Sequence, residues 1–368
     1  MSATRLACAS KPKANCSSAP CFQSATLPIG IAVRGPFGVA IRVAIRHHVV
    51  SAICQGQGDM EPKRSDTPLN IALLALAGGI VVAVYFAPLL FGPLPFGGKA
   101  ALVALAALTA PMHWGLMHEA IHAKLFASSG VNLMVGRLLG ISIGLSFDSM
   151  RFGHLMHHRA NRHSFDRPED YPEGKSWFVA AIGYYFTLLG GGTLKASLTP
   201  LPVLLPSTGT RWAIRRLMAG EDSANVKQAA LRTFTDPSRR RRMRTDFLAT
   251  LSLMSLAVMA WGRGWPVFAL CILVRWTVLS LLDNAPHYGT ARDAGNAAHN
   301  TRLPPLLSWL VLNGNYHGVH HEVAELGWQD LPAAFHHLDA HFAGRWLPTL
   351  LRQFRGPVRI ADTGAAGT

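Results

Sequence analysis

Long apolar stretches, separated by short breaks rich in glycine, proline or charge, dominate the sequence after residue 68. No charged residue occurs from Leu69 to Gly98, and Asn70–Phe91 is long enough for one helix to cross the roughly 30 Å hydrocarbon layer of a bilayer. A glycine- and proline-rich break separates it from a second apolar stretch, Ala100–Met117. The pattern predicts a hairpin of two membrane-spanning helices.

A second pair of apolar stretches follows later in the chain, Phe247–Gly262 and Trp265–Asp283, with Arg263 and Gly264 between them. Arg275 lies within the second stretch, where a long side chain can reach toward the membrane interface. We interpret this pair as a second hairpin. The sequence therefore predicts an all-α integral membrane fold with four transmembrane helices in two hairpins.

Two other apolar stretches are interrupted by residues that are unfavourable in a membrane span. Arg137 interrupts Val131–Phe147, whereas Gly190–Gly192 and several prolines interrupt Trp177–Pro206. We expect both stretches to form interfacial or half-inserted helices rather than spans.

The composition of the chain is typical of a membrane protein, and the distribution of its basic residues predicts how it is oriented in the membrane. Of the 368 residues only 15% are charged, against about 25% in a typical soluble domain. The segment Lys124–Asp246 holds 18 of the basic residues, whereas the two turns between paired spans hold only Lys99 and Arg263. Because basic loops stay in the cytosol, both ends of the body and this middle segment are expected there. The run Arg239–Arg242 fits that orientation signal, and docking of an acidic electron donor is the alternative.

The first 59 residues differ from the rest. They contain no acidic residue before Asp59 and carry four of the five cysteines. Such a segment resembles an organellar transit peptide, or else translation begins at Met60. We expect residues 1–59 to be a leader outside the fold, residues 60–345 to form the membrane domain, and residues 346–368 to be a C-terminal tail.

Nine of the 17 histidines stand in clusters or beside the last apolar stretch. Positions i, i+3 and i+4 share one face of a helix, so each cluster points its imidazoles in one direction. Imidazole suits iron, zinc, copper and nickel. Nine rings are too many for one tetrahedral zinc but suffice for two metal ions. The nine are His118, His122, His154, His157, His158, His287, His317, His320 and His321.

A shared metal site requires that all nine histidines lie on one side of the membrane. With four spans, His118 and His122 end the second helix on the cytosolic side, and His287 follows the return of the fourth helix to that side. If Val131–Phe147 crossed the bilayer, it would separate the first two clusters. The sequence therefore predicts a cytosolic, histidine-rich helical cap.

The histidine clusters and their neighbours resemble the membrane fatty-acid desaturase family, whose signature is three histidine boxes of these spacings. The resemblance extends from about Asn70 to about Leu338. It implies a non-haem di-iron centre that uses O₂ to remove hydrogen from a lipid chain, and a separate ferredoxin or cytochrome as electron donor. The expected partners are therefore the membrane and a lipid or acyl substrate, and not nucleic acid. The segments that carry the resemblance are Phe152–Arg159, Asp166–Asp170, Asn300–Arg302, Asn315–His321 and Leu331–Pro332.

The chain departs from the family pattern in two places. Where the acyl-CoA branch has an asparagine four positions before its ninth histidine, this chain has Asp283. The usual proline-rich continuation of the third box is replaced by Glu322–Trp328. Carboxylates and amides commonly orient metal-bound imidazoles, and the candidates for this role are Asp166, Glu169, Asp170, Asp283 and Asn284.

Two other enzyme functions remain open from sequence. A related di-iron site could hydroxylate or ketolate a carotenoid or alkane, because the outcome depends on how the substrate is placed. Alternatively, His118-Glu119-x-x-His122 satisfies the H-E-x-x-H motif of zinc metalloproteases, with Asp283 as a distant third ligand. The protease hypothesis leaves six clustered histidines without a role.

Overall fold

The computed structural model describes residues 67–160, 166–219, 223–291 and 298–360. The leader predicted at residues 1–59 and the last eight residues of the predicted tail lie outside the described residues. The described part is mostly helical and contains two small two-stranded parallel sheets.

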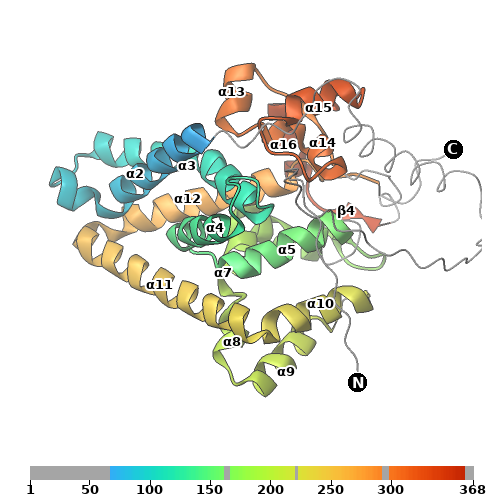
Figure 1. The fold of residues 1–368 in the computed structure, drawn as a ribbon, viewed down its shortest axis with the longest axis horizontal. Coiled ribbons are helices and arrows are strands. Elements are labelled where there is room, and N and C mark those ends of the chain that lie inside the picture. The colour runs from blue at the N-terminus through green and yellow to red at the C-terminus, as the bar shows by residue number, and fades with distance from the viewer. Residues whose placement is uncertain (1–66, 161–165, 220–222, 292–297, 361–368) are drawn as a thin grey trace, which may run out of the picture. The chain divides into compact units, whose positions relative to one another are not determined.

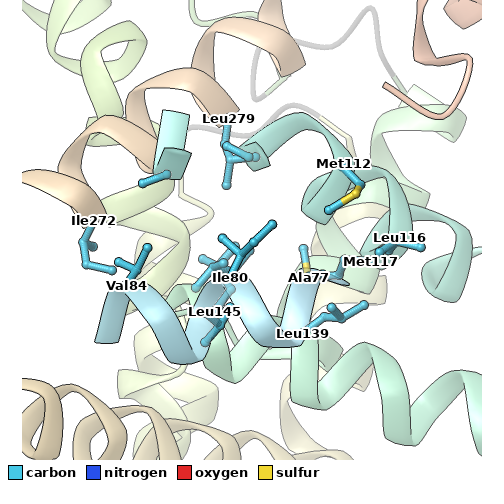
Figure 2. Close-up of a cluster of buried hydrophobic side chains, with 14 of the residues drawn as sticks. Ala77, Ile80, Val84, Met112, Leu116, Met117, Leu139, Leu145, Ile272 and Leu279 are labelled. Carbon is cyan, nitrogen blue, oxygen red and sulfur yellow. The ribbon is translucent and has the colours of Figure 1, made fainter. Parts of the chain in front are cut away.

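Helices α2 (Thr67–Phe91) and α3 (Phe96–Ile121) contact each other and form the first apolar pair. Pro95 precedes α3 in an extended conformation, so the chain turns in the proline- and glycine-rich break. The pair packs against α4 and α12 around a buried apolar cluster (Figure 2). Its labelled side chains are Ala77, Ile80, Val84, Met112, Leu116, Met117, Leu139, Leu145, Ile272 and Leu279.

Helices α4 (Ser129–Ile143) and α5 (Phe147–Ala160) are bent by 101° at the short break between them. Gly144 adopts a positive φ of 88° at the C-cap of α4, a conformation that glycine allows at little cost. Phe147 then packs over Gly136, where an added Cβ would lie 2.2 Å from its ring. The bend turns α5 away from α4 toward the C-terminal end of α3, with which α5 is in contact.

The stretch Trp177–Leu204 is helical, as predicted, apart from a turn at Thr199–Pro200. It consists of α6 (Trp177–Phe186), a π-helical turn η2 (Thr187–Gly191), α7 (Gly192–Leu198) and α8 (Leu201–Leu204). Leu189 and Gly190 have non-helical backbone angles within the π turn, and Gly190 has a φ of 101°, which glycine adopts at little cost. The glycine run therefore kinks the helical stretch, as its sequence predicts, and the kinked turn packs against α12.

Helices α9 (Ser207–Leu217) and α10 (Ala224–Thr235) lead into α11 (Pro237–Trp261). A 3₁₀ turn η3 (Gly262–Gly264) joins α11 to α12 (Trp265–Asn284), and Figure 1 shows the two helices diverging from that turn. Helix α12 contacts α3 and η2, whereas α11 contacts α2 and α4.

The elements from Thr301 to Arg359 cover the end of the molecule at which α3, α5 and α12 finish (Figure 1). Trp346–Ile360, expected to be part of a tail, forms regular elements that are tied to the body by Tyr288, whose hydroxyl donates to Gly356 O at 2.7 Å. Strand β1 (Asp170–Tyr171) pairs with β4 (Val358–Arg359), and β2 (Thr301–Arg302) pairs with β3 (Gly344–Arg345). The remaining elements are α13 (Pro305–Leu310), η4 (Gly314–Tyr316), α14 (His317–Glu322), α15 (Leu331–His337), α16 (Trp346–Arg352) and η5 (Gln353–Arg355).

Four helical segments among the described residues are long and apolar enough to cross a membrane. Two are α2 and α3, as expected. The second predicted pair lies within one apolar segment, Pro237–Asn284, and the fourth candidate is Trp177–Leu204. Large apolar side chains such as Leu108 and Phe178 stay exposed on these segments, as outward faces in contact with lipid require. The bent pair α4–α5 would be a fifth only as a broken span.

Candidate metal centre

Three helices and one turn carry the nine clustered histidines. His118 lies in the last turn of α3 and His122 is its C-cap. Helix α5 carries His154, His157 and His158, and α14 carries His317, His320 and His321. His287 lies in the turn that follows α12.

All nine predicted histidines converge into two groups of ring nitrogens. Within each group one nitrogen of every member lies within 4.8 Å of those of all the others. Successive residues of an α-helix point about 100° apart, so His157 and His158 turn toward different groups, as do His320 and His321. The first group is His118, His122, His154, His158 and His320, and the second is His157, His287, His317 and His321.

The second group forms a closed ring of short contacts between Nε2 atoms. His157 lies 3.0 Å from His287 and 3.1 Å from His321, and His317 lies 2.9 Å from His287 and 3.1 Å from His321. A point in the middle of four nitrogens with such separations is about 2 Å from each, which is the length of a metal–imidazole bond. The donor set therefore fits one metal ion.

The first group has the same character. Nε2 of His154 lies 2.9 Å from that of His122 and 3.0 Å from that of His158, which is 3.0 Å from that of His320. The buried Nε2 of His118 has no hydrogen-bond partner among the described residues. A buried nitrogen without a partner is costly, and a metal ion bound by this group would satisfy it.

Burial keeps most of these rings neutral. It lowers the pKa of His122 and of His158 to about 2, with the neighbouring imidazoles adding to the shift. The pKa of His154, His317 and His320 falls well below the usual value for the same reasons. Neutral imidazole is the form that binds metal ions.

His157 differs because a carboxylate fixes its ring. Burial lowers its pKa, but Asp166 outweighs burial and raises it above the usual value. Oδ2 of Asp166 lies 2.5 Å from Nδ1 of His157. The proton therefore belongs on Nδ1, and the lone pair of Nε2 points into the second group.

Glu119 lies beside the first group near the C-terminal end of α3. Its Oε2 accepts a hydrogen bond from the backbone N–H of Trp328 at 3.1 Å, and its Oε1 lies 3.6 Å from Nδ1 of His118. The carboxylate is buried. The loop after the third histidine box therefore holds this carboxylate through Trp328, which argues against the free general base of a zinc protease.

The other residues predicted to orient the histidines have different partners. Asp170 pairs with Arg167, with Oδ2 2.9 Å from Nε, and Glu169 lies 3.3 Å from the same guanidinium. Asn284 donates a hydrogen bond of 2.9 Å to Oε1 of Gln353. Asp283 lines both of the cavities described next.

Two cavities reach the histidines. One of about 490 Å³ runs between α6–α7 and α12 to His157 and His287. A smaller one of about 90 Å³ touches both groups, at His118, His154, His317 and His320. Trp114 and Asp283 line both cavities. Trp114 was missed from sequence, although its position four residues before His118 places it on the same helix face.

Comparison with known proteins assigns the family. A family model described as fatty acid desaturase matches residues 94–351, which is more than half of the chain and includes all nine histidines. Comparison with the curated proteins gives no match. Four candidate membrane spans agree with an integral membrane protein. The chain therefore belongs to the fatty acid desaturase family of membrane-bound, lipid-modifying oxidoreductases.

Proposed function

We propose that this protein is a membrane di-iron enzyme that uses O₂ to introduce a double bond into a fatty acyl or related lipid chain. The observation that carries the proposal is the convergence of nine imidazoles into groups of five and four. The buried ring nitrogens face one another, and neutral imidazoles carry too few N–H protons for every such contact to be a hydrogen bond. Two bound metal ions would satisfy these nitrogens. Iron is proposed because the family is generally iron-dependent.

His118, His122, His154, His158 and His320 would hold one iron, and His157, His287, His317 and His321 the other. Bound iron would supply the oxidising power, drawn from O₂ and two electrons, that breaks an unactivated C–H bond. The chain's own residues hold the rings in place: Asp166 fixes His157, and Glu119 lies against His118. Asp283, Asn284 and Asp170 are proposed to support this arrangement from outside the ring of ligands.

The cavities suit a long substrate that enters from the membrane. The larger one is bounded by the candidate span Trp177–Leu204 and by α12, so it lies between helices with lipid-facing sides. The smaller, more enclosed cavity adjoins both histidine groups, where exclusion of water protects a strong oxidant. We propose that the lipid chain runs from the first cavity toward the second, past Trp114 and Asp283.

We further propose that the histidines face the cytosol and that a separate ferredoxin or cytochrome delivers electrons there. The support is the concentration of basic residues between Lys124 and Asp246, which the positive-inside rule assigns to the cytosol. In this topology Trp177–Leu204 lies half-inserted at the cytosolic interface, because a crossing there would put α9 and α10 on the other side of the membrane from α5. The elements after α12 then form the predicted cap. Protease accessibility of the α9–α10 connection in oriented vesicles tests the side.

Lipid profiling of a host that expresses the chain tests the function. New unsaturated chains are expected with the wild type and none with His320→Ala, because that variant lacks a ligand of the first group. His336→Ala is the matched control, since His336 is exposed and lies outside both groups. His320→Ala should also retain less iron while still inserting into the membrane.

Other product patterns would replace the proposal. Hydroxylated or keto products that depend on His320 would keep the metal site but change the reaction. Peptide cleavage that depends on Glu119 would favour the metalloprotease. Full desaturase activity in His320→Ala would remove that residue from the ligand set.

A further inference from the structure

Helix α16 has two different faces and separates the histidine cavity from the outside of the molecule. Its inner face places Trp346, Thr349 and Leu350 against the smaller cavity, which touches both histidine groups. Its outer face lines a separate, open hollow of about 340 Å³, and Thr349 lines both spaces. Helix α14, which carries the third histidine box, lines the same cavity at His317 and His320.

Three arginines surround the outer hollow. Arg345 immediately precedes α16, Arg352 is its last residue, and Arg355 follows in η5. All three side chains line the same hollow. Among the described residues none of the three guanidinium groups has a hydrogen-bond or ion-pair partner, and no acidic residue lines the hollow. The pairing of β2 with β3 places a fourth arginine, Arg302, opposite Arg345.

Clustered guanidinium groups without acidic partners repel one another, so the hollow favours an anion. Arginine presents planar, forked donors that match the oxygens of a phosphate, and several around one cavity form a typical phosphate site. From this geometry we propose that Arg345, Arg352 and Arg355 form a phosphate-binding site on the outer face of α16. The site is separate from the histidine groups, because α16 itself lies between them.

Phosphate bound at this site would also stabilise the wall of the smaller cavity on the other face of α16. A phosphate that bridges Arg345 and Arg352 links the two ends of α16, and so holds the wall formed by Trp346, Thr349 and Leu350 in place. The same phosphate chemistry could come from the head group of a membrane lipid or from a soluble phosphate compound. Either ligand stabilises the folded protein in proportion to its occupancy.

The test measures thermal unfolding of the full chain in nanodiscs at constant ionic strength. In one arm the nanodiscs contain only phosphatidylcholine and inorganic pyrophosphate is titrated. In the other arm phosphatidic acid is added to the nanodiscs and pyrophosphate is omitted. Arg352→Gln/Arg355→Gln is compared with Arg215→Gln/Arg216→Gln, which removes two exposed arginines from α9.

A saturable rise of the unfolding midpoint is expected in at least one arm for the wild type and for the α9 variant. The α16 variant should bind pyrophosphate at least about tenfold more weakly, because it lacks two charge-assisted donors. Without phosphate it should unfold no earlier than the wild type, since fewer like charges face the hollow, and this excludes a folding defect. A response to pyrophosphate identifies a soluble ligand, and a response only to phosphatidic acid identifies a lipid head group.

Three results would overturn the proposal. The midpoint could fail to rise in both arms, or it could rise equally for the wild type and the α16 variant. Polyglutamate could also bind where phosphate does not, which would make this surface a docking site for an acidic protein. None of these results depends on the reaction at the histidines, so the site and the proposed desaturation can fail separately.

Discussion

At the scale of single residues, the Asp166 carboxylate determines which nitrogen of His157 carries the proton. Its contact with Nδ1 leaves Nε2 free to face His287 and His321. In the first group Glu119 is held by the backbone N–H of Trp328, with its other oxygen 3.6 Å from Nδ1 of His118. The orientation of the His157 ring therefore depends on a carboxylate that is not itself in either group.

Asp166→Ala should weaken metal binding by the second group by about 10- to 100-fold, as is typical when a residue that orients a ligand is lost. The reason is that the His157 ring can then rotate or exchange its protonated nitrogen. Iron retained per chain during titration with a chelator measures the effect. Glu173→Ala is the control, because Glu173 is exposed. Equal iron retention in the two variants would contradict the orienting role of Asp166.

At the scale of secondary-structure elements, the glycine run in η2 allows α12 to approach closely. The hydroxyl of Thr277 donates to Leu189 O at 3.1 Å, and that of Thr193 donates to Trp276 O at 3.2 Å. A Cβ on Gly190 would lie 3.3 Å from the backbone nitrogen of Thr277 in α12. Within the π turn itself, a Cβ on Gly191 would lie 2.4 Å from the carbonyl oxygen of Phe186. The π turn thus joins the helices of Trp177–Leu204 to α12, which ends beside His287.

Gly191→Ala should destabilise the protein by about 1–3 kcal/mol, the usual cost of inserting a methyl group into a packed site. Because the clash is with backbone, a side-chain rotation cannot relieve it. Gly183→Ala in α6 is the matched control, since an added Cβ there meets nothing within 4 Å. The comparison is made by thermal unfolding in detergent. Equal midpoints for the two variants would show that η2 adapts without cost.

At the scale of the whole molecule, two ion pairs tie the bent α4–α5 unit to the base of α11. Arg137 in α4 contacts Asp246 at 2.7 Å, and Arg242 contacts Asp148 in α5 at 2.7 Å. These pairs hold the helix of the second histidine box against a candidate membrane span. Part of the basic run Arg239–Arg242 therefore has a structural use in addition to the orientation signal.

Arg137→Met should destabilise the fold by about 2 kcal/mol, because it leaves the fully buried carboxylate of Asp246 without its partner. Partial exposure of Arg137 keeps the cost below that of a fully buried pair. The double variant Arg137→Met/Asp246→Leu should recover much of the loss, since no unpaired charge remains. Unfolding midpoints of both single variants and the double variant form the test. Strictly additive effects would show that the two side chains are not coupled.

The amino-acid sequence by itself was sufficient to predict the mostly helical fold, the first pair of apolar helices and the nine histidines that come together. These features depend on local patterns: the length of apolar runs and the spacing of histidines along a helix. The family assignment follows from the same patterns, and the family match confirms it. The leader at residues 1–59 stays a prediction, because it lies outside the described residues.

Only the tertiary structure decided how the nine histidines divide between two groups. That division depends on the angles at which α3, α5 and α14 meet, and sequence spacing carries no information about such angles. The same holds for the place where the kink at Gly190 packs, since its contact with α12 joins segments far apart in the sequence. It also holds for Trp346–Ile360, where contacts with distant residues order a segment whose local sequence resembles a tail.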